Sequence, residues 1–174
     1  MKTSIYISKK LEKSFSKKIN ISEEHPTNYF GKWNAQIFFI DRQKWFLITH
    51  SETKFSIVLP NINANNISKI KDLFMESLYQ QFIYESVDIT REKLNVLIGE
   101  LVFHKTDNDK KTIGTQNSIL ELIKNWKYQK NDILCSTKEL SKRLNMSPTN
   151  SFKWKSPREM MLEKIKTTGN NGYS

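Results

Sequence analysis

Hydrophobic and polar positions alternate in the N-terminal third of the chain, which is typical of β-strands. TSIYIS (Thr3–Ser8) predicts a short first strand. Residues 33–62, WNAQIFFIDRQKWFLITHSETKFSIVLPNI, hold three runs of aromatic and β-branched residues separated by DRQK and HSET. This spacing predicts an antiparallel meander whose last strand ends before Pro60. The run LVFHK (101–105) predicts a fifth strand.

Apolar positions three and four residues apart predict helices before, between and after these strands. KKLEKSFSKKI places Leu11 and Phe15 on one helix face, and residues 63–87 repeat apolar positions at the same spacing. A further helix follows Thr90, and SILELIKNWKYQ (118–129) predicts another. The fold class expected from this order is α+β: an antiparallel β-meander sheet with helices packed on one face.

The chain divides into a core and an extension. We expect residues 1–130 to form the α+β core domain, residues 131–166 a basic C-terminal helical extension packed on the core, and residues 167–174 a disordered tail. We expect the extension to pack on the sheet through Phe152, Trp154 and Met161. The sequence near its start, STKELSKRLNMSPTN, also has the residue pattern of the first helix and turn of a DNA-binding helix-turn-helix.

Charge narrows the choice of partner. The net charge of +10 lies mainly at the two ends, because residues 1–20 hold six basic and one acidic residue, and residues 135–174 hold eight and three. Such clustering predicts binding to nucleic acid, RNA rather than DNA, or to another polyanion, in a toxin-like or defence setting. The alternative is a protein-interaction partner without a ligand site, whose lysines are merely solvated.

Several classes of site are excluded by composition. The single Cys135 and three scattered histidines lack the spacing of a disulfide framework or a metal site, so no metal or cofactor is expected. Signatures such as GxSxG, HExxH and the P-loop are absent, which leaves enzymatic activity open. No apolar stretch predicts a signal peptide or membrane span, so we expect a cytoplasmic protein without a membrane partner.

The segment HKTDNDKKTIGTQNSILELI (104–123) is the first candidate site. Lysines, a glycine that permits close backbone approach, and capping side chains before a helix could form a phosphate cradle at the helix N-terminus. The alternative is a polar loop with an ordinary helix cap. The phosphate or nucleic-acid residues expected on the first interpretation are Lys105, Lys110, Lys111, Gly114, Thr115 and Asn117, with Arg42 from the meander.

Two histidines form the second candidate site. His50 and His104 each follow a predicted strand. If their side chains face each other, one imidazole could take the 2′-hydroxyl proton of RNA while the other protonates the leaving oxygen. This would be a metal-independent ribonuclease. The alternative is a pair of unrelated histidines at the sheet rim.

The motif order is similar to that of a bacterial family catalogued only as a domain of unknown function. The matching features, over residues 1–128, are IYISKKLEKSF, Trp33, IDRQKWFLITHSETKFSIVLP, VFHKT and IGTQNS. The resemblance implies one compact α+β unit in bacteria or their mobile elements, and no established activity. By this resemblance, the positions that match the motifs of the family are Arg42, Thr49, Thr53, Ser56, Lys105, Gly114 and Asn117. Where relatives have arginine and Gly-Ser-Met-Asn, this chain has Lys111 and Thr115-Gln116-Asn117, so no bidentate phosphate contact is implied.

Overall fold

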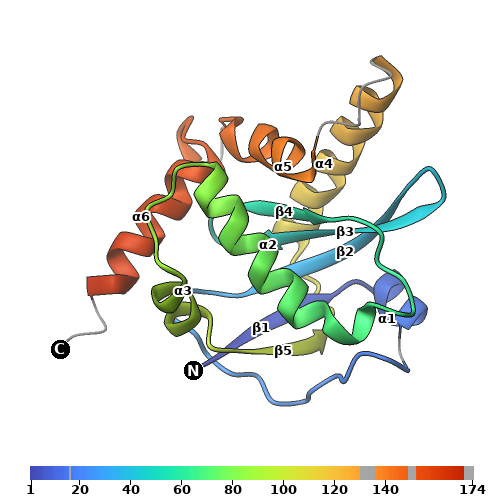
Figure 1. Cartoon of the computed structure of the whole chain (residues 1–174), viewed down its shortest axis with the longest axis horizontal. Coiled ribbons are helices and arrows are strands. Elements are labelled where there is room, and N and C mark those ends of the chain that lie inside the picture. The colour runs from blue at the N-terminus through green and yellow to red at the C-terminus, as the bar shows by residue number, and fades with distance from the viewer. Residues whose placement is uncertain (16, 130–135, 149–151, 171–174) are drawn as a thin grey trace.

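The computed structural model describes residues 1–174 except 16, 130–135, 149–151 and 171–174 (Figure 1). Its strands are β1 (Lys2–Ile7), β2 (Trp33–Ile40), β3 (Gln43–His50), β4 (Ser56–Leu59) and β5 (Glu100–Lys105). Its helices are α1 (Lys9–Phe15), η1 (Ile67–Lys69, a 3-10 turn), α2 (Ile70–Tyr84), α3 (Arg91–Ile98), α4 (Lys110–Gln129), α5 (Thr137–Met146) and α6 (Pro157–Asn170).

The five strands form one mixed sheet in the order β4-β3-β2-β1-β5. Strands β2, β3 and β4 form the expected antiparallel meander. The prediction of a purely antiparallel sheet is wrong, however, because β1 pairs in parallel with both β2 and β5. Helix α1 and the segment that follows it carry the chain from the end of β1 back to its start, as a parallel pair requires.

Helices cover both faces of the sheet, which corrects the prediction of one covered face (Figure 1). We call these two faces of the sheet the α2 face and the α4 face, after the helices that cover them. The α2 face holds the larger core, with Ile5, Trp33, Ile48 and Ile57 packed against Leu11 of α1, Phe74 and Phe82 of α2, Leu94 of α3 and Met161 of α6. The α4 face holds a separate cluster of Phe38, Ile40, Leu47, Val58, Ile119, Ile123, Leu140 and Leu144.

The C-terminal helices belong to this layered structure. Met161 and Ile165 of α6 are buried in the larger core, whereas Trp154, one of the expected packing residues, is 70% exposed. Thr90 caps α3 as expected, since its hydroxyl accepts a hydrogen bond from the Lys93 N–H. Of the tail expected to be disordered, residues 167–170 form the end of α6, and residues 171–174 lie outside the described residues.

Helix α5 covers the outer edge of β4 with side chains instead of another strand. The Ser141 hydroxyl accepts a hydrogen bond from the Val58 N–H at 3.1 Å. The Asn145 amide accepts from the Ser56 N–H at 2.7 Å and donates to the Ser56 carbonyl at 3.0 Å, as a neighbouring strand would. The same amide donates to the carboxylate of Glu85 at the end of α2, where burial raises the Glu85 pKa despite this bond.

Replacing Asn145 with alanine should lower the free energy of unfolding by about 3 kcal/mol, because the buried Ser56 N–H and the Glu85 carboxylate lose their partner. Urea denaturation measures this difference. Asn125, on the exposed surface of α4, supplies the control: Asn125→Ala should change the free energy of unfolding by less than roughly 0.5 kcal/mol. Equal stability of the two variants would contradict the edge-covering role of Asn145.

Candidate functional site

A row of polar side chains crosses the α4 face of the sheet. Tyr6 of β1 pairs with His104 of β5 on one side and with Asn34 of β2 on the other. Asn34 pairs in turn with Thr49 of β3, which pairs with Ser56 of β4. The row consists of His104, Tyr6, Asn34, Thr49 and Ser56. This row lies between the apolar cluster under α4 and a polar region next to the start of β2 and the end of β3, which contains Lys32 and Lys54.

Helix α4 begins over this row, eight residues earlier than the pattern SILELI predicts. Asp109 is its cap: the carboxylate accepts hydrogen bonds from the N–H and the hydroxyl of Thr112, at 3.1 and 2.8 Å. Burial alone would raise the Asp109 pKa, but these bonds and the nearby charges of Lys54 and Lys32 together outweigh burial, and the pKa lies below its ordinary value. The positive end of the helix dipole is therefore already matched by a carboxylate of the chain.

Lysines on both sides complete this network of charges. Lys32 forms an ion pair with Asp107 at 2.5 Å, and the Asp107 carboxylate also accepts from the Asn34 amide at 3.0 Å. Lys54 is buried and donates to the Thr112 hydroxyl at 2.7 Å, and burial lowers its pKa. The network sets two lysines, Lys32 and Lys54, beside two carboxylates, Asp107 and Asp109, so its formal charges balance.

The expected phosphate cradle is not what the structure shows. Gly114 lies inside α4 with open space around it, so it forms no loop that approaches a ligand. Lys110 and Lys111 are exposed on the first turn, and the Thr115 hydroxyl donates to the Lys111 carbonyl. The sequence signal for the true helix start was Asp109 followed at the third position by Thr112.

A crevice consists of two hollows that share Tyr6: one lies at the carboxyl ends of β1 and β5, and the other lies over Ser4 of β1 and beside Lys32, which precedes β2. One hollow, of about 290 Å³, is lined by Tyr6, Ser8, Lys9, Asn34, Ala35, Gln36, Thr106, Asn108, Ile113 and Gln116. The other, of about 510 Å³, is lined by Ser4, Tyr6, His25, Pro26, Thr27, Asn28, Gly31, Lys32, Ser51, Glu52 and Asp109. The helices that follow these parallel strands, α1 and α4, lie on opposite faces. Ligands of open α/β sheets characteristically bind at such a switch point.

Tyr6, His25 and His104 form an aromatic cluster at this crevice. The His104 ring centroid lies 5.0 Å from that of Tyr6 and 5.1 Å from that of His25. The Nδ1–H of His104 donates to the Ser22 carbonyl at 3.1 Å, while Nε2 is buried without a partner among the described residues. Burial lowers the His104 pKa, although the bond to Ser22 opposes the shift. His25, by contrast, is exposed. Sequence reasoning missed His25 because it follows no strand.

His50 does not meet His104. It projects from β3 onto the α2 face, whereas His104 projects onto the α4 face, three strand positions away. The His50 Nε2–H donates to the Phe30 carbonyl at 2.7 Å, and Nδ1 accepts from the N–H and the hydroxyl of Thr53. These bonds hold the segment before β2 against the β3–β4 turn. The structure thus does not bring the two histidines together as an acid–base pair.

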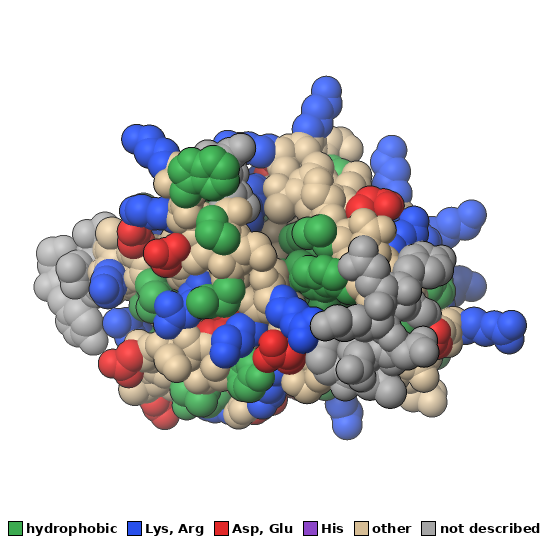
Figure 2. Space-filling view, turned by 90° about the horizontal axis from the view of Figure 1, so that it is seen from above, with side chains coloured by type: hydrophobic (Ala, Val, Ile, Leu, Met, Phe, Trp, Pro, Cys, Tyr) green, Lys and Arg blue, Asp and Glu red, His purple; other side chains and the backbone are tan. Residues whose placement is uncertain are grey.

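The remaining predicted cations are dispersed. Arg42 is exposed in the tight turn between β2 and β3, where positive φ angles at Asp41 and Arg42 (46° and 66°) are those of a type I′ turn. Lys105 is exposed and lies 3.8 Å from the Glu12 carboxylate. Figure 2 shows Lys and Arg side chains projecting from many parts of one face of the molecule instead of gathering in one patch.

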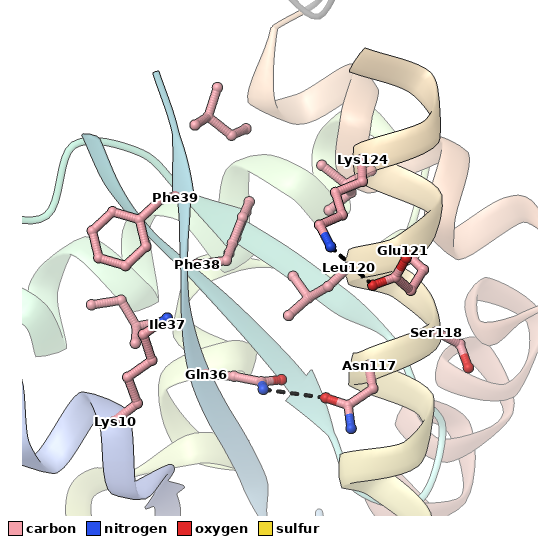
Figure 3. Close-up of a pocket in the computed structure, with 12 residues that line it drawn as sticks. Lys10, Gln36, Ile37, Phe38, Phe39, Asn117, Ser118, Leu120, Glu121 and Lys124 are labelled. Atoms are coloured by element: carbon pink, nitrogen blue, oxygen red, sulfur yellow. Dashed lines mark hydrogen bonds and ion pairs between the residues drawn. The ribbon is translucent and has the colours of Figure 1, made fainter. Parts of the chain in front are cut away.

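A second groove lies between β2 and α4, with a volume of about 730 Å³ (Figure 3). Phe38 of β2 and Leu120 of α4 face each other across it, and Lys10 of α1 lies on the other side of β2. The Gln36 amide donates to Asn117 at 3.3 Å, which is the contact the structure assigns to Asn117. The groove meets the crevice at Gln36, which lines both.

The described residues contain neither a metal-binding cluster nor a membrane-spanning helix. No group of three or more His, Cys, Asp and Glu side chains there could hold a metal ion. No helix among these residues is both long and apolar enough to cross a membrane.

Stability should fall between about pH 6.5 and pH 4 because of His50. Burial lowers its pKa from 6.5 to about 4, so the unfolded chain binds more protons across this window. The contribution, on the order of 3 kcal/mol, is complete above pH 6.5 and lost as the pH falls through the folded-state pKa. Urea unfolding of wild type and His50→Gln at several pH values measures it, and the variant should show a shallower slope.

His104 is present in both proteins, so the difference in slope between wild type and His50→Gln isolates His50. A His50→Gln protein with the full wild-type pH dependence would contradict the assignment.

Comparison with known proteins agrees with the resemblance noted in the sequence. No curated protein matches the chain. The family model described as Domain of unknown function (DUF6933) matches residues 4–160, which extends past the expected limit at residue 128 to include α5 and the start of α6. The chain therefore belongs to this family of unknown function.

Proposed function

We propose that the protein binds single-stranded nucleic acid, RNA in preference to DNA, in the crevice formed by the two hollows that share Tyr6. The observation that carries the proposal is the position of the hollow lined by Ser8 and Thr106 at the switch point between two parallel strands whose helices lie on opposite faces. Its lining offers amide and hydroxyl groups for hydrogen bonds, and the rings of Tyr6 and His25 for contact with bases.

The positive net charge supports the same proposal, mainly through long-range attraction of a polyanion and less through specific contacts with phosphate groups. Lys32 is matched by Asp107, so Lys9 is the lining lysine for which the structure shows no carboxylate partner among the described residues. The net charge of +10 attracts a polyanion from all sides. Binding should therefore be strongest at low salt and weaken steeply as salt is added.

We propose that the protein binds RNA without cleaving it. Metal-independent cleavage of RNA by two imidazoles needs both of them at the substrate. At the crevice His25 is exposed, but His104 is 1% exposed and lies behind it, and His50 is on the opposite face. An RNA oligomer incubated with the protein should remain intact.

Lys9→Glu should weaken binding of a fluorescein-labelled uridine oligomer roughly tenfold at low salt, because one phosphate contact becomes a repulsion. Fluorescence anisotropy measures the dissociation constant, with a thymidine oligomer in parallel to compare RNA with DNA. Lys93→Glu on α3 is the matched control, since it makes the same change of net charge at an exposed position on a helix that packs on the opposite face of the sheet.

Equal weakening by Lys9→Glu and Lys93→Glu would show that net charge alone attracts the oligomer, and it would remove the crevice as the site. If neither RNA nor DNA binds at low salt, the proposed function is overturned.

A further inference from the structure

Strand β2 has an open edge along its second half. Its ladder with β1 ends at Ala35, whose carbonyl accepts the last hydrogen bond from the Ser8 N–H at 2.9 Å. Strand β2 continues to Ile40, and no strand of the described part of the chain pairs with its residues 36–40 on that side. Backbone direction alternates along a strand, so Ile37 and Phe39, like Ala35, point their N–H and C=O groups to this open side.

The groove between β2 and α4 runs along this edge. Five consecutive residues of β2, Gln36–Ile40, line it, and together they span about 15 Å of extended backbone. Lys10 of α1 borders it on one side, and Asn117 to Lys124 of α4 border it on the other (Figure 3). An unpaired strand edge within a groove fits an extended chain, because only another extended backbone satisfies its alternating donors and acceptors.

Both sides of the edge offer apolar contacts at the spacing of a strand. Alternate side chains of an added strand point to opposite faces of the sheet. One set would lie over Phe38 and Leu120 on the α4 face, and the other over Phe39, which is 49% exposed. Phe39 is held in this position by the Lys10 ammonium, which lies 4.8 Å from its ring centroid.

Charge distinguishes between the occupants that could add a strand. Lys10 and Lys124 line the groove, and Glu121, which pairs with Lys124 at 3.2 Å, is its single lining carboxylate. A second copy of the chain would bring the same lysines against themselves across a two-fold axis. An acidic segment meets them favourably. We propose that the open edge of β2 docks an extended acidic peptide of a partner protein, which adds a sixth strand to the sheet.

The test uses a fluorescein-labelled peptide of about ten residues that alternates valine and glutamate, a length that spans the edge with a margin at each end. Fluorescence anisotropy should show saturable binding to the wild-type protein. Phe39→Pro removes an N–H that points to the open side and leaves the β2–β3 ladder intact. It should weaken binding at least tenfold more than Phe39→Ala, which removes the ring but keeps the N–H.

A second measurement keeps the proposal falsifiable if Phe39→Pro fails to fold. The same peptide with N-methyl groups on alternate residues has the same charge and side chains but lacks half of its donors, and it should bind wild-type protein at least tenfold more weakly. Equal binding of the methylated peptide would overturn strand addition.

Two further binding experiments test which kind of ligand the groove accepts. A peptide alternating valine and lysine should not bind, and equal affinity for it would overturn the acidic partner. A uridine oligomer that displaces the acidic peptide from Lys9→Glu protein, whose crevice is weakened, as well as from wild type would assign the groove to nucleic acid and overturn the proposal. Absence of saturable binding of the acidic peptide would overturn it as well. None of these results depends on the crevice at β1 and β5.

Discussion

The hydrogen-bonding groups at the edges of the sheet are the constraint on which the structure depends. A mixed sheet of five strands leaves unpaired N–H and C=O groups along its outer strands, and each such group, if buried, destabilises the fold. At β4 the side chains of Ser141 and Asn145 take the place of a neighbouring strand. At β5 the chain itself returns, with Ile21 bridging to Phe103 and the Ser22 N–H donating to the Phe103 carbonyl. The second half of β2 is the exception.

These edge contacts also position the crevice. The segment that bonds to the edge of β5 continues directly into His25, so covering the edge places the His25 ring over His104 and Tyr6. At the other end, the bond from His50 to Phe30 holds the same segment against the β3–β4 turn, close to Gly31. One connection of the chain thus closes a sheet edge, supplies the crevice with its exposed imidazole and joins β1 to β2.

Local patterns predicted the elements much better than their arrangement. Alternation identified all five strands, and the meander followed from the short connections between β2, β3 and β4, since close neighbours in sequence pair readily. The parallel pairing of β1 could not be read in this way, because it depends on a long connection that has no periodic signal. Gly114 was misleading, since glycine is a weak helix former and here lies within a helix whose true cap is Asp109. Pairing of His50 with His104 required knowledge of which sheet face each residue occupies, and that depends on register between strands distant in sequence.

The cover of β4 by α5 has a consequence for the chain while it is being made. Strand β4 is complete at Leu59, but the side chains that satisfy its outer edge come more than eighty residues later. A nascent chain that has emerged only through α4 therefore presents a bare, strongly apolar strand to its surroundings. Between the synthesis of β4 and that of Asn145 the outer edge of β4 lacks its cover, so the unfinished chain can mispair there with other chains.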